Sequence, residues 1–230
     1  NIKNVKPGVR KAIEEKMRGW KDPQKYYIDN LAYGIAKIGA AFYPRHVIVR
    51  FSDFKTNEYS TLLGGEKYEP QEENPMIGWR GASRYYDPKF KEAFMLEARA
   101  ILKVREEMGL TNVIPMVPFC RTVEEGIKTQ EAMAEVGLFT KYTLSGKDAK
   151  GKAVTPIYVM CEIPSNVLLA DDFLDIFDGM SIGSNDLTQL TLGLDRDSGI
   201  VTHIANEKDS SVKKLVAEII HKCKEKNKYI

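Results

Sequence analysis

Hydrophobic residues recur along the chain in blocks that alternate between helical and extended spacing. Apolar side chains three and four positions apart predict a helix over residues 8–43, and Pro44 ends this pattern. The β-branched run over residues 46–51 is typical of a short strand. We therefore expect a leading helical segment, residues 1–45, followed by strands and helices over residues 46–230.

The alternation continues to the C-terminus. Further strands are predicted at residues 75–80, 112–117, 156–163 and 180–183, and another begins at Lys228. Helices are predicted at residues 89–108, 122–137, 165–177 and 211–226, with an exposed loop at residues 139–155. Strands that alternate with helices indicate a parallel sheet covered by helices, and the strand count suits part of a (β/α)₈ TIM-type barrel. We predict one incomplete α/β barrel domain over residues 1–230.

Composition narrows the class of partner. The 230 residues are 43% hydrophobic, enough for one core, and the net charge is only +2, which gives no general attraction to nucleic acid or membranes. No apolar run is long enough to span a bilayer. Three cysteines without a CxxC pair argue against disulfide stapling and a Cys₄ zinc site, and they favour a reducing, cytoplasmic setting.

Polar residues follow the predicted strands, where parallel α/β folds bind ligands. They are Arg50, Ser52, Asp53, Arg80, Arg121, Glu162, Ser184, Asn185 and Asp186. Arg50 and Arg80 can each clamp a carboxylate or phosphate in a fork. The alternative for each arginine is a salt bridge at the rim with Asp53, Glu58 or Asp87.

Two carboxylates suggest a metal site. Glu162 follows an apolar run and precedes Ile163-Pro164, so it should be desolvated and require a cation or donors. Asp186 ends the next strand, and two carboxylates with water and a ligand oxygen suit Mg²⁺. The residues leave open a second interpretation, in which Asp186 or Asn185 only caps a helix and Glu162 pairs with a nearby arginine.

The segment Gly183-Ser184-Asn185-Asp186 precedes a predicted helix. Glycine permits close backbone approach, and the first N–H groups of a helix can hold an anionic oxygen. An ordinary strand-to-helix turn explains the same residues. No cysteine has an evident histidine partner, and the three histidines lack the spacing of metal ligands.

Five segments together carry a resemblance to a known family. They are VIVRFSDFKTNEY (47–59), ENPMIGWRGASRYYD (73–87), PFCRTVEE (118–125), MCEIPSN (160–166) and SIGSNDLTQLTLGLDRDSG (181–199). They resemble the C-terminal barrel of the phosphoenolpyruvate synthases (pyruvate, water dikinases), which belong to the PEP-utilising enzymes. They are more distantly similar to pyruvate phosphate dikinase and to the first enzyme of the sugar phosphotransferase system. The resemblance covers about residues 25–230.

The resemblance implies a domain of a larger kinase of gluconeogenesis. Such an enzyme converts ATP, pyruvate and water to AMP, phosphoenolpyruvate and phosphate, with an ATP-binding domain and a phosphohistidine domain as partners. By resemblance, Glu162 and Asp186 bind Mg²⁺, and Arg50 with the segment Gly183 to Asp186 contacts pyruvate or phosphoenolpyruvate. Arg80 is expected to contact the transferring phosphoryl group.

Parts of the family pattern have no counterpart in this sequence. A GxGLxRxEF-like first strand, the GxCGQ-like segment with the proton-donating cysteine and the last strand are missing, and Cys120, Cys161 and Cys223 do not match that acid. We expect a barrel without its first and last two strands, with no catalytic residue of its own and inactive alone. Its open edges predict a homodimer, or ends that are present but disordered. A second hypothesis is a non-catalytic ligand-binding or interaction module.

Overall fold

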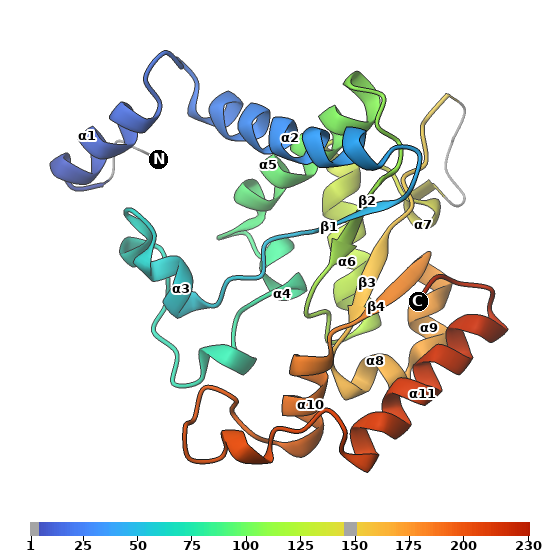
Figure 1. Ribbon diagram of the computed structural model, residues 1–230. Coiled ribbons are helices and arrows are strands. Elements are labelled where there is room, and N and C mark those ends of the chain that lie inside the picture. The colour runs from blue at the N-terminus through green and yellow to red at the C-terminus, as the bar shows by residue number, and fades with distance from the viewer. Residues whose placement is uncertain (1–4, 145–150) are drawn as a thin grey trace.

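Four parallel strands form the sheet of this protein in a computed structural model that describes residues 5–144 and 151–230 (Figure 1). The strands are β1 (Val47–Arg50), β2 (Val113–Val117), β3 (Tyr158–Cys161) and β4 (Gly179–Ile182). They lie in the order of the chain, and every neighbouring pair is parallel. The sheet is not closed, which confirms the predicted partial (β/α) barrel. Beyond β4, an isolated parallel bridge joins Gly179 to Tyr229, in the segment where the sequence predicts that a further strand begins.

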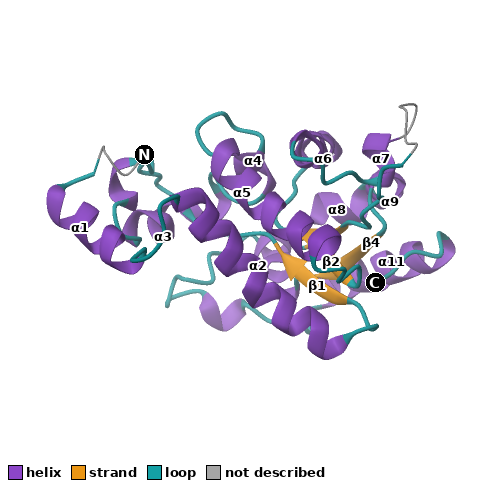
Figure 2. Cartoon of the chain, turned by 90° about the horizontal axis from the view of Figure 1, so that it is seen from above, coloured by secondary structure: helices purple, strands orange, loops and turns teal. Residues whose placement is uncertain are grey.

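Helices connect and cover the strands (Figures 1 and 2). They are α1 (Pro7–Lys16), α2 (Pro23–Phe42), α3 (Thr56–Thr61), α4 (Ala82–Tyr85), α5 (Lys91–Leu102), α6 (Val123–Glu135), α7 (Lys141–Leu144), α8 (Pro164–Leu168), α9 (Ala170–Ile176), α10 (Ser184–Leu192) and α11 (Ser210–Glu225). Single turns lie at Gly65–Lys67, Pro75–Ile77 and Thr202–Ile204, and a π-helical turn at Lys103–Glu107 extends α5. None of these helices is long and apolar enough to cross a membrane.

Burial follows position in the sheet. All five residues of β2 are buried, as expected for a parallel strand covered on both faces. Residues of β1, at the edge of the sheet, are only partly buried. This free edge is where the predicted homodimer would pair, and the dimer stays a prediction.

The predicted helix over residues 8–43 is wrong as a single element. It is two helices, α1 and α2, because Gly19 takes a positive φ of 91° and Asp22 starts a new helix by accepting a hydrogen bond from Gln24 N–H at 2.8 Å. α1 lies away from the sheet, where Val9 packs near Gly64 (Figure 2).

The predicted strand over residues 75–80 is also wrong. Pro75–Ile77 form a 3₁₀ turn, and Trp79 N–H donates to the Glu72 carboxylate at 2.9 Å instead of to a neighbouring strand. An acceptor within the same loop thus replaces the sheet partner that the apolar spacing suggested. This change matters for the site, because Arg80 leaves a compact loop and not the end of a strand.

Helix starts were predicted with mixed success. The predicted helix at residues 122–137 is confirmed as α6, and Thr122 caps it by accepting from Glu125 N–H at 3.2 Å. The predicted helix at residues 165–177 is two helices, α8 and α9, and the Ser165 hydroxyl, inside α8, donates to Arg121 C=O at 2.8 Å. The predicted loop at 139–155 contains the short α7, and its residues 145–150 lie outside the described residues.

Candidate functional site

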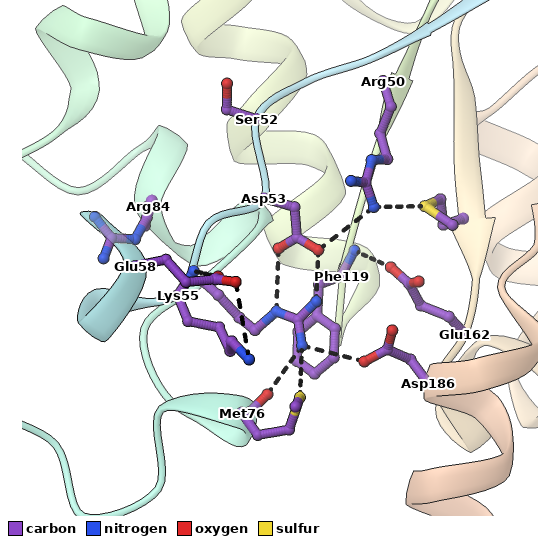
Figure 3. Close-up of polar contacts among 12 residues, drawn as sticks. Arg50, Ser52, Asp53, Lys55, Glu58, Met76, Arg84, Phe119, Glu162 and Asp186 are labelled. Carbon is purple, nitrogen blue, oxygen red and sulfur yellow. Dashed lines mark hydrogen bonds and ion pairs between the residues drawn. The ribbon is translucent and has the colours of Figure 1, made fainter. Parts of the chain in front are cut away.

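The carboxyl ends of the strands bring Asp53, Glu162 and Asp186 to one edge of the sheet, where their side chains converge (Figure 3). Asp53 follows β1, Glu162 follows β3, and Asp186 lies in the first turn of α10, just after β4. All three carboxylates are buried. Three negative charges in so small a buried space need cations or donors to offset their desolvation.

Arg80 supplies the main compensating charge. Its side chain is 5% exposed and forms a fork on Asp53, with Nη2 at 2.5 Å from Oδ2 and Nε at 3.1 Å from Oδ1. Its Nη1 donates to Asp186 Oδ1 and to the carbonyl of Met76, both at 3.1 Å. The predicted alternative of a salt bridge with Asp53 is therefore real, but the pair is buried within the site and not at its rim.

Phe119 supports this arginine through its ring. The Arg80 guanidinium lies 4.0 Å from the centre of the Phe119 ring, a cation–π distance, and Arg121 lies over the same ring at 4.7 Å. Phe119 has a positive φ of 44°, which is uncommon for a residue with a side chain. Gly81 lies against it so closely that a Cβ there would be 2.5 Å from Phe119 Cβ. A strained backbone therefore lies directly beside the site.

The backbone of Phe119 also holds Glu162. Its N–H donates to Glu162 Oε1 at 2.6 Å, while Oε2 accepts no hydrogen bond from the described part of the chain. Burial, the largest cause, raises the pKa of Glu162 to about 7, and the charges of Asp186 and Asp53 add to the rise. The Phe119 N–H and Arg80 lower the pKa of Glu162 and only partly offset this effect.

Asn166 fixes the position of Glu162 relative to the neighbouring loop. Its side-chain oxygen accepts from the N–H groups of Glu162 and Ile163 at 3.2 and 3.0 Å, and its amide donates to Cys120 C=O at 2.7 Å. These bonds close a ring that runs from the Glu162 backbone through Asn166 to the loop of Phe119, and from there back to the Glu162 carboxylate. The ends of β2 and β3 are thereby locked together.

Asp186 forms ion pairs with two arginines. Besides Arg80, Arg196 places Nη1 at 3.3 Å from Asp186 Oδ2. Gly183 precedes α10 and gives it no side-chain cap, so the alternative in which Asn185 or Asp186 only caps a helix is not supported. The Ser184 hydroxyl instead donates to Glu207 at 2.7 Å.

Two predicted site residues contribute less than expected through their side chains. Asn185 is exposed, and the Ser184 hydroxyl is occupied by Glu207, so neither side chain hydrogen-bonds to Asp53, Glu162 or Asp186 within the described residues. Arg50 is half-exposed at 47% and lies 3.7 Å from Asp53 Oδ2, which leaves its guanidinium accessible at the mouth of the site. Arg121 donates to the carbonyl of Gly78 and serves the loop instead of the site.

Sequence reasoning missed several contributors. Phe119, Asn166 and Arg196 all lie in the quoted segments, but neither apolar spacing nor the position of strand ends selects them. Arg196 is not at a strand end, so the rule that ligands bind at strand ends does not select it.

The described side chains do not by themselves form a complete set of metal ligands. Within residues 5–144 and 151–230, no three His, Cys, Asp or Glu side chains form a cluster that could hold a metal ion. All three cysteines are free and buried, and burial raises the pKa of Cys161 to about 12 and that of Cys223 to about 11. Burial also raises the pKa of Cys120 well above its usual value, so all three thiols stay protonated at neutral pH.

The amino-acid sequence of this chain matches a known protein family and several known proteins. Residues 12–230 match the family described as "PEP-utilising enzyme, PEP-binding domain", where PEP is phosphoenolpyruvate. The chain is similar to the phosphoenolpyruvate synthase of Synechocystis sp., with 59% identity over 203 residues, or 88% of this chain and 24% of that protein. The Aquifex aeolicus phosphoenolpyruvate synthase is 58% identical over 93% of this chain and 24% of its own length.

A further relative is the phosphoenolpyruvate synthase of Escherichia coli, which is 50% identical over 97% of this chain and 27% of its own length. These matches confirm the resemblance inferred from the five quoted segments. The chain spans about a quarter of the length of these relatives.

Gly183 tests how tightly the site is packed. A Cβ at Gly183 would lie 2.5 Å from Glu162 Oε2 and 2.8 Å from Glu162 Cβ, so we expect Gly183→Ala to displace Glu162 and to lower the free energy of unfolding by about 1–3 kcal/mol. Gly199→Ala is the matched control, because nothing lies within 4 Å of that position. Urea denaturation measures both, and equal stabilities would contradict the close contact.

The raised pKa of Glu162 predicts a pH dependence of stability. The native state binds the proton more tightly than the unfolded chain, so this contribution is full below 4.5 and is lost as pH rises through about 7. We expect wild type to lose on the order of 3 kcal/mol relative to Glu162→Gln across this range. Urea denaturation at several pH values checks this, and parallel curves for the two proteins would be inconsistent with the shift.

Proposed function

The chain belongs to the family of PEP-utilising enzymes as a PEP-binding domain, and from this premise we propose that it binds phosphoenolpyruvate and pyruvate with Mg²⁺ as part of a phosphoenolpyruvate synthase. The observation that carries the proposal is the juxtaposition of Glu162 and Asp186 with Arg80 at one buried edge of the sheet. Carboxylate oxygens suit a hard cation, and guanidinium groups suit a phosphate or carboxylate.

The residues present fit Mg²⁺. The ion prefers oxygen ligands, keeps several waters and is commonly bound by one or two carboxylates, so a cluster of three is not required. Glu162 and Asp186 would hold it, and Glu162 Oε2 is the carboxylate oxygen without a donor among the described residues. When bound, the ion supplies a Lewis acid that stabilises the negative charge of the pyruvate enolate.

Three arginines would neutralise the anionic substrate. Arg80 is fixed by Asp53 and is thus preorganised to meet the transferring phosphoryl group, while Arg50 is exposed enough to reach the ligand carboxylate or phosphate. Arg196 adds a third guanidinium beside Asp186. The backbone N–H groups of Ser184 to Asp186, at the start of α10, would donate to a substrate oxygen, whereas Gly183 N–H donates to Cys161 C=O at 3.0 Å.

The whole reaction extends beyond these residues. We propose that the protein carrying this domain converts ATP, pyruvate and water to AMP, phosphoenolpyruvate and phosphate in the cytoplasm, with partner domains for ATP and phosphohistidine. None of Cys120, Cys161 and Cys223 stands in a GxCGQ-like segment, and on this ground we propose that the chain is inactive on its own. The predicted homodimer belongs to the same proposal.

A titration tests the metal half of the site. Mg²⁺ with oxalate, a mimic of enolpyruvate, is titrated by calorimetry into wild type and Asp186→Ala. We expect at least about a tenfold loss of Mg²⁺-dependent oxalate affinity, because one of two anionic metal ligands is removed. Asp175→Ala is the control, since Asp175 is exposed on α9 and pairs with Lys226 at 2.7 Å. Equal affinity in wild type and Asp186→Ala would remove Asp186 from the metal site.

A product analysis separates the synthase from its relatives. The natural protein that contains this domain is supplied with ATP and pyruvate, and we expect AMP and phosphate without any added phosphate. A strict need for added phosphate, with release of pyrophosphate, would identify a pyruvate phosphate dikinase instead. Absence of any nucleotide turnover would favour the non-catalytic module.

A further inference from the structure

Glu97 is a buried carboxylate outside the site described above. It lies on α5, 7% of its surface is exposed, and none of the described basic side chains forms an ion pair with it. Burial raises the pKa of Glu97, and hydrogen bonds from Ser52 partly offset this rise. A buried carboxylate without a cation destabilises a fold unless its contacts compensate, so the contact with Ser52 is the one to explain.

Ser52 is where the chain leaves the sheet. Phe51 N–H still donates to Met116 C=O of β2 at 3.0 Å, but Ser52 N–H has no strand to bond and donates to Glu97 Oε2 at 3.0 Å. On its other side, Ser52 C=O accepts from the Tyr85 hydroxyl at 2.7 Å. Glu97 on α5 and Tyr85 on α4 therefore bond to both polar groups of the Ser52 backbone. We call this pair of hydrogen bonds the clamp.

Aromatic packing fixes this clamp in place. Phe51 is buried and meets Phe94 and Tyr85 edge-on, with ring centres 5.0 and 5.9 Å apart. Tyr85 and Phe94 stack at 4.3 Å. Phe94 and Glu97 are three positions apart on α5 and so face the same way, which aligns the carboxylate with the end of β1.

The clamp acts on the next residue, Asp53. Ser52 and Asp53 are adjacent and their side chains point in opposite directions (Figure 3), so the Ser52 backbone sets the direction of the Asp53 carboxylate. That carboxylate is 1% exposed, receives the fork of Arg80 and lies 3.7 Å from Arg50. A rotation of the Ser52 peptide would turn Asp53 away from both arginines.

We propose that Glu97 is a positioning residue, which holds Ser52 so that Asp53 presents Arg80 and Arg50 to the anionic ligand. The effect on ligand affinity rests on the proposed function, whereas the effect on Arg80 does not. Ser52 N–H needs only an acceptor of the right reach. A glutamine at this position supplies such an acceptor, methionine removes it at similar length, and aspartate is one methylene too short.

The experiment compares E97Q, E97M and E97D with wild type. Proton exchange of the Ser52 amide and the ¹⁵N resonance of Arg80 Nε–H are measured by NMR without ligand, and affinity for PEP with Mg²⁺ is measured by calorimetry. In E97M and E97D we expect Ser52 exchange at least about tenfold faster, an altered Arg80 resonance and about tenfold weaker PEP affinity. E97Q should stay within about twofold of wild type on each measure.

Gln130→Met is the matched control for a general loss of stability. Gln130 is buried on α6, where it accepts from the Thr140 hydroxyl at 2.6 Å and donates to Ile176 C=O at 3.1 Å. Neither of these hydrogen bonds involves a residue of the clamp. The Gln130→Met variant should have a lower free energy of unfolding, while its Arg80 resonance and PEP affinity stay unchanged. If it changes both as much as E97M does, Glu97 has only a structural role and the proposal fails.

The other outcomes also decide. If E97M leaves the Arg80 resonance unchanged and the Ser52 amide protected, the proposal is overturned. It is also overturned if E97Q differs from wild type in these two measurements as much as E97M does. If E97M does not fold, the same measurements on E97D distinguish these outcomes. If wild type itself does not bind PEP while the NMR changes appear as expected, the proposed function fails and the positioning role of Glu97 stands.

Discussion

A single buried guanidinium, that of Arg80, ties together the parts of this protein on which the site depends. It bonds to Asp53 after β1, to Asp186 after β4 and to the carbonyl of Met76, and it rests on the ring of Phe119 after β2. A buried cation is tolerated only when its charge is matched and its donors are satisfied. The strand ends must therefore converge for Arg80 to be buried, and its burial in turn holds them together.

The three buried carboxylates, those of Asp53, Asp186 and Glu162, differ in how far their negative charge is compensated. Asp53 is engaged by the Arg80 fork and is structural in this arrangement, and Asp186 is shared between Arg80 and Arg196. Glu162 is the poorly compensated member, with a backbone N–H as its donor and a pKa raised to about 7 by burial and its acidic neighbours. An added cation would favour the ionised form of Glu162, which is the physical link between the ligand-free electrostatics and the proposed Mg²⁺ site.

Beneath these charges, the site is built on contacts that leave little room for adjustment. Gly183 lets the backbone of α10 pass close to Glu162, and Gly81 lets Phe119 adopt its positive φ of 44°. Asn166 joins the loops after β2 and β3, while Glu97 and Tyr85 hold the residue before Asp53. In the proposed function, an anionic substrate would meet dipoles and cations that are already oriented, which would reduce the reorganisation needed on binding.

The sequence by itself determined the elements that depend on local burial. Apolar runs located β1 to β4, Thr122 marked the start of α6, and the rule that ligands bind at strand ends selected Arg50, Glu162 and Asp186. These strands, the helix start and the strand-end residues can be predicted from sequence because they depend on neighbours in the chain. Tertiary structure decided the rest: residues 75–80 form a loop because Glu72 supplies the acceptor for Trp79. Arg80 meets partners 27 and 106 positions away, a pairing that only the register of the sheet creates.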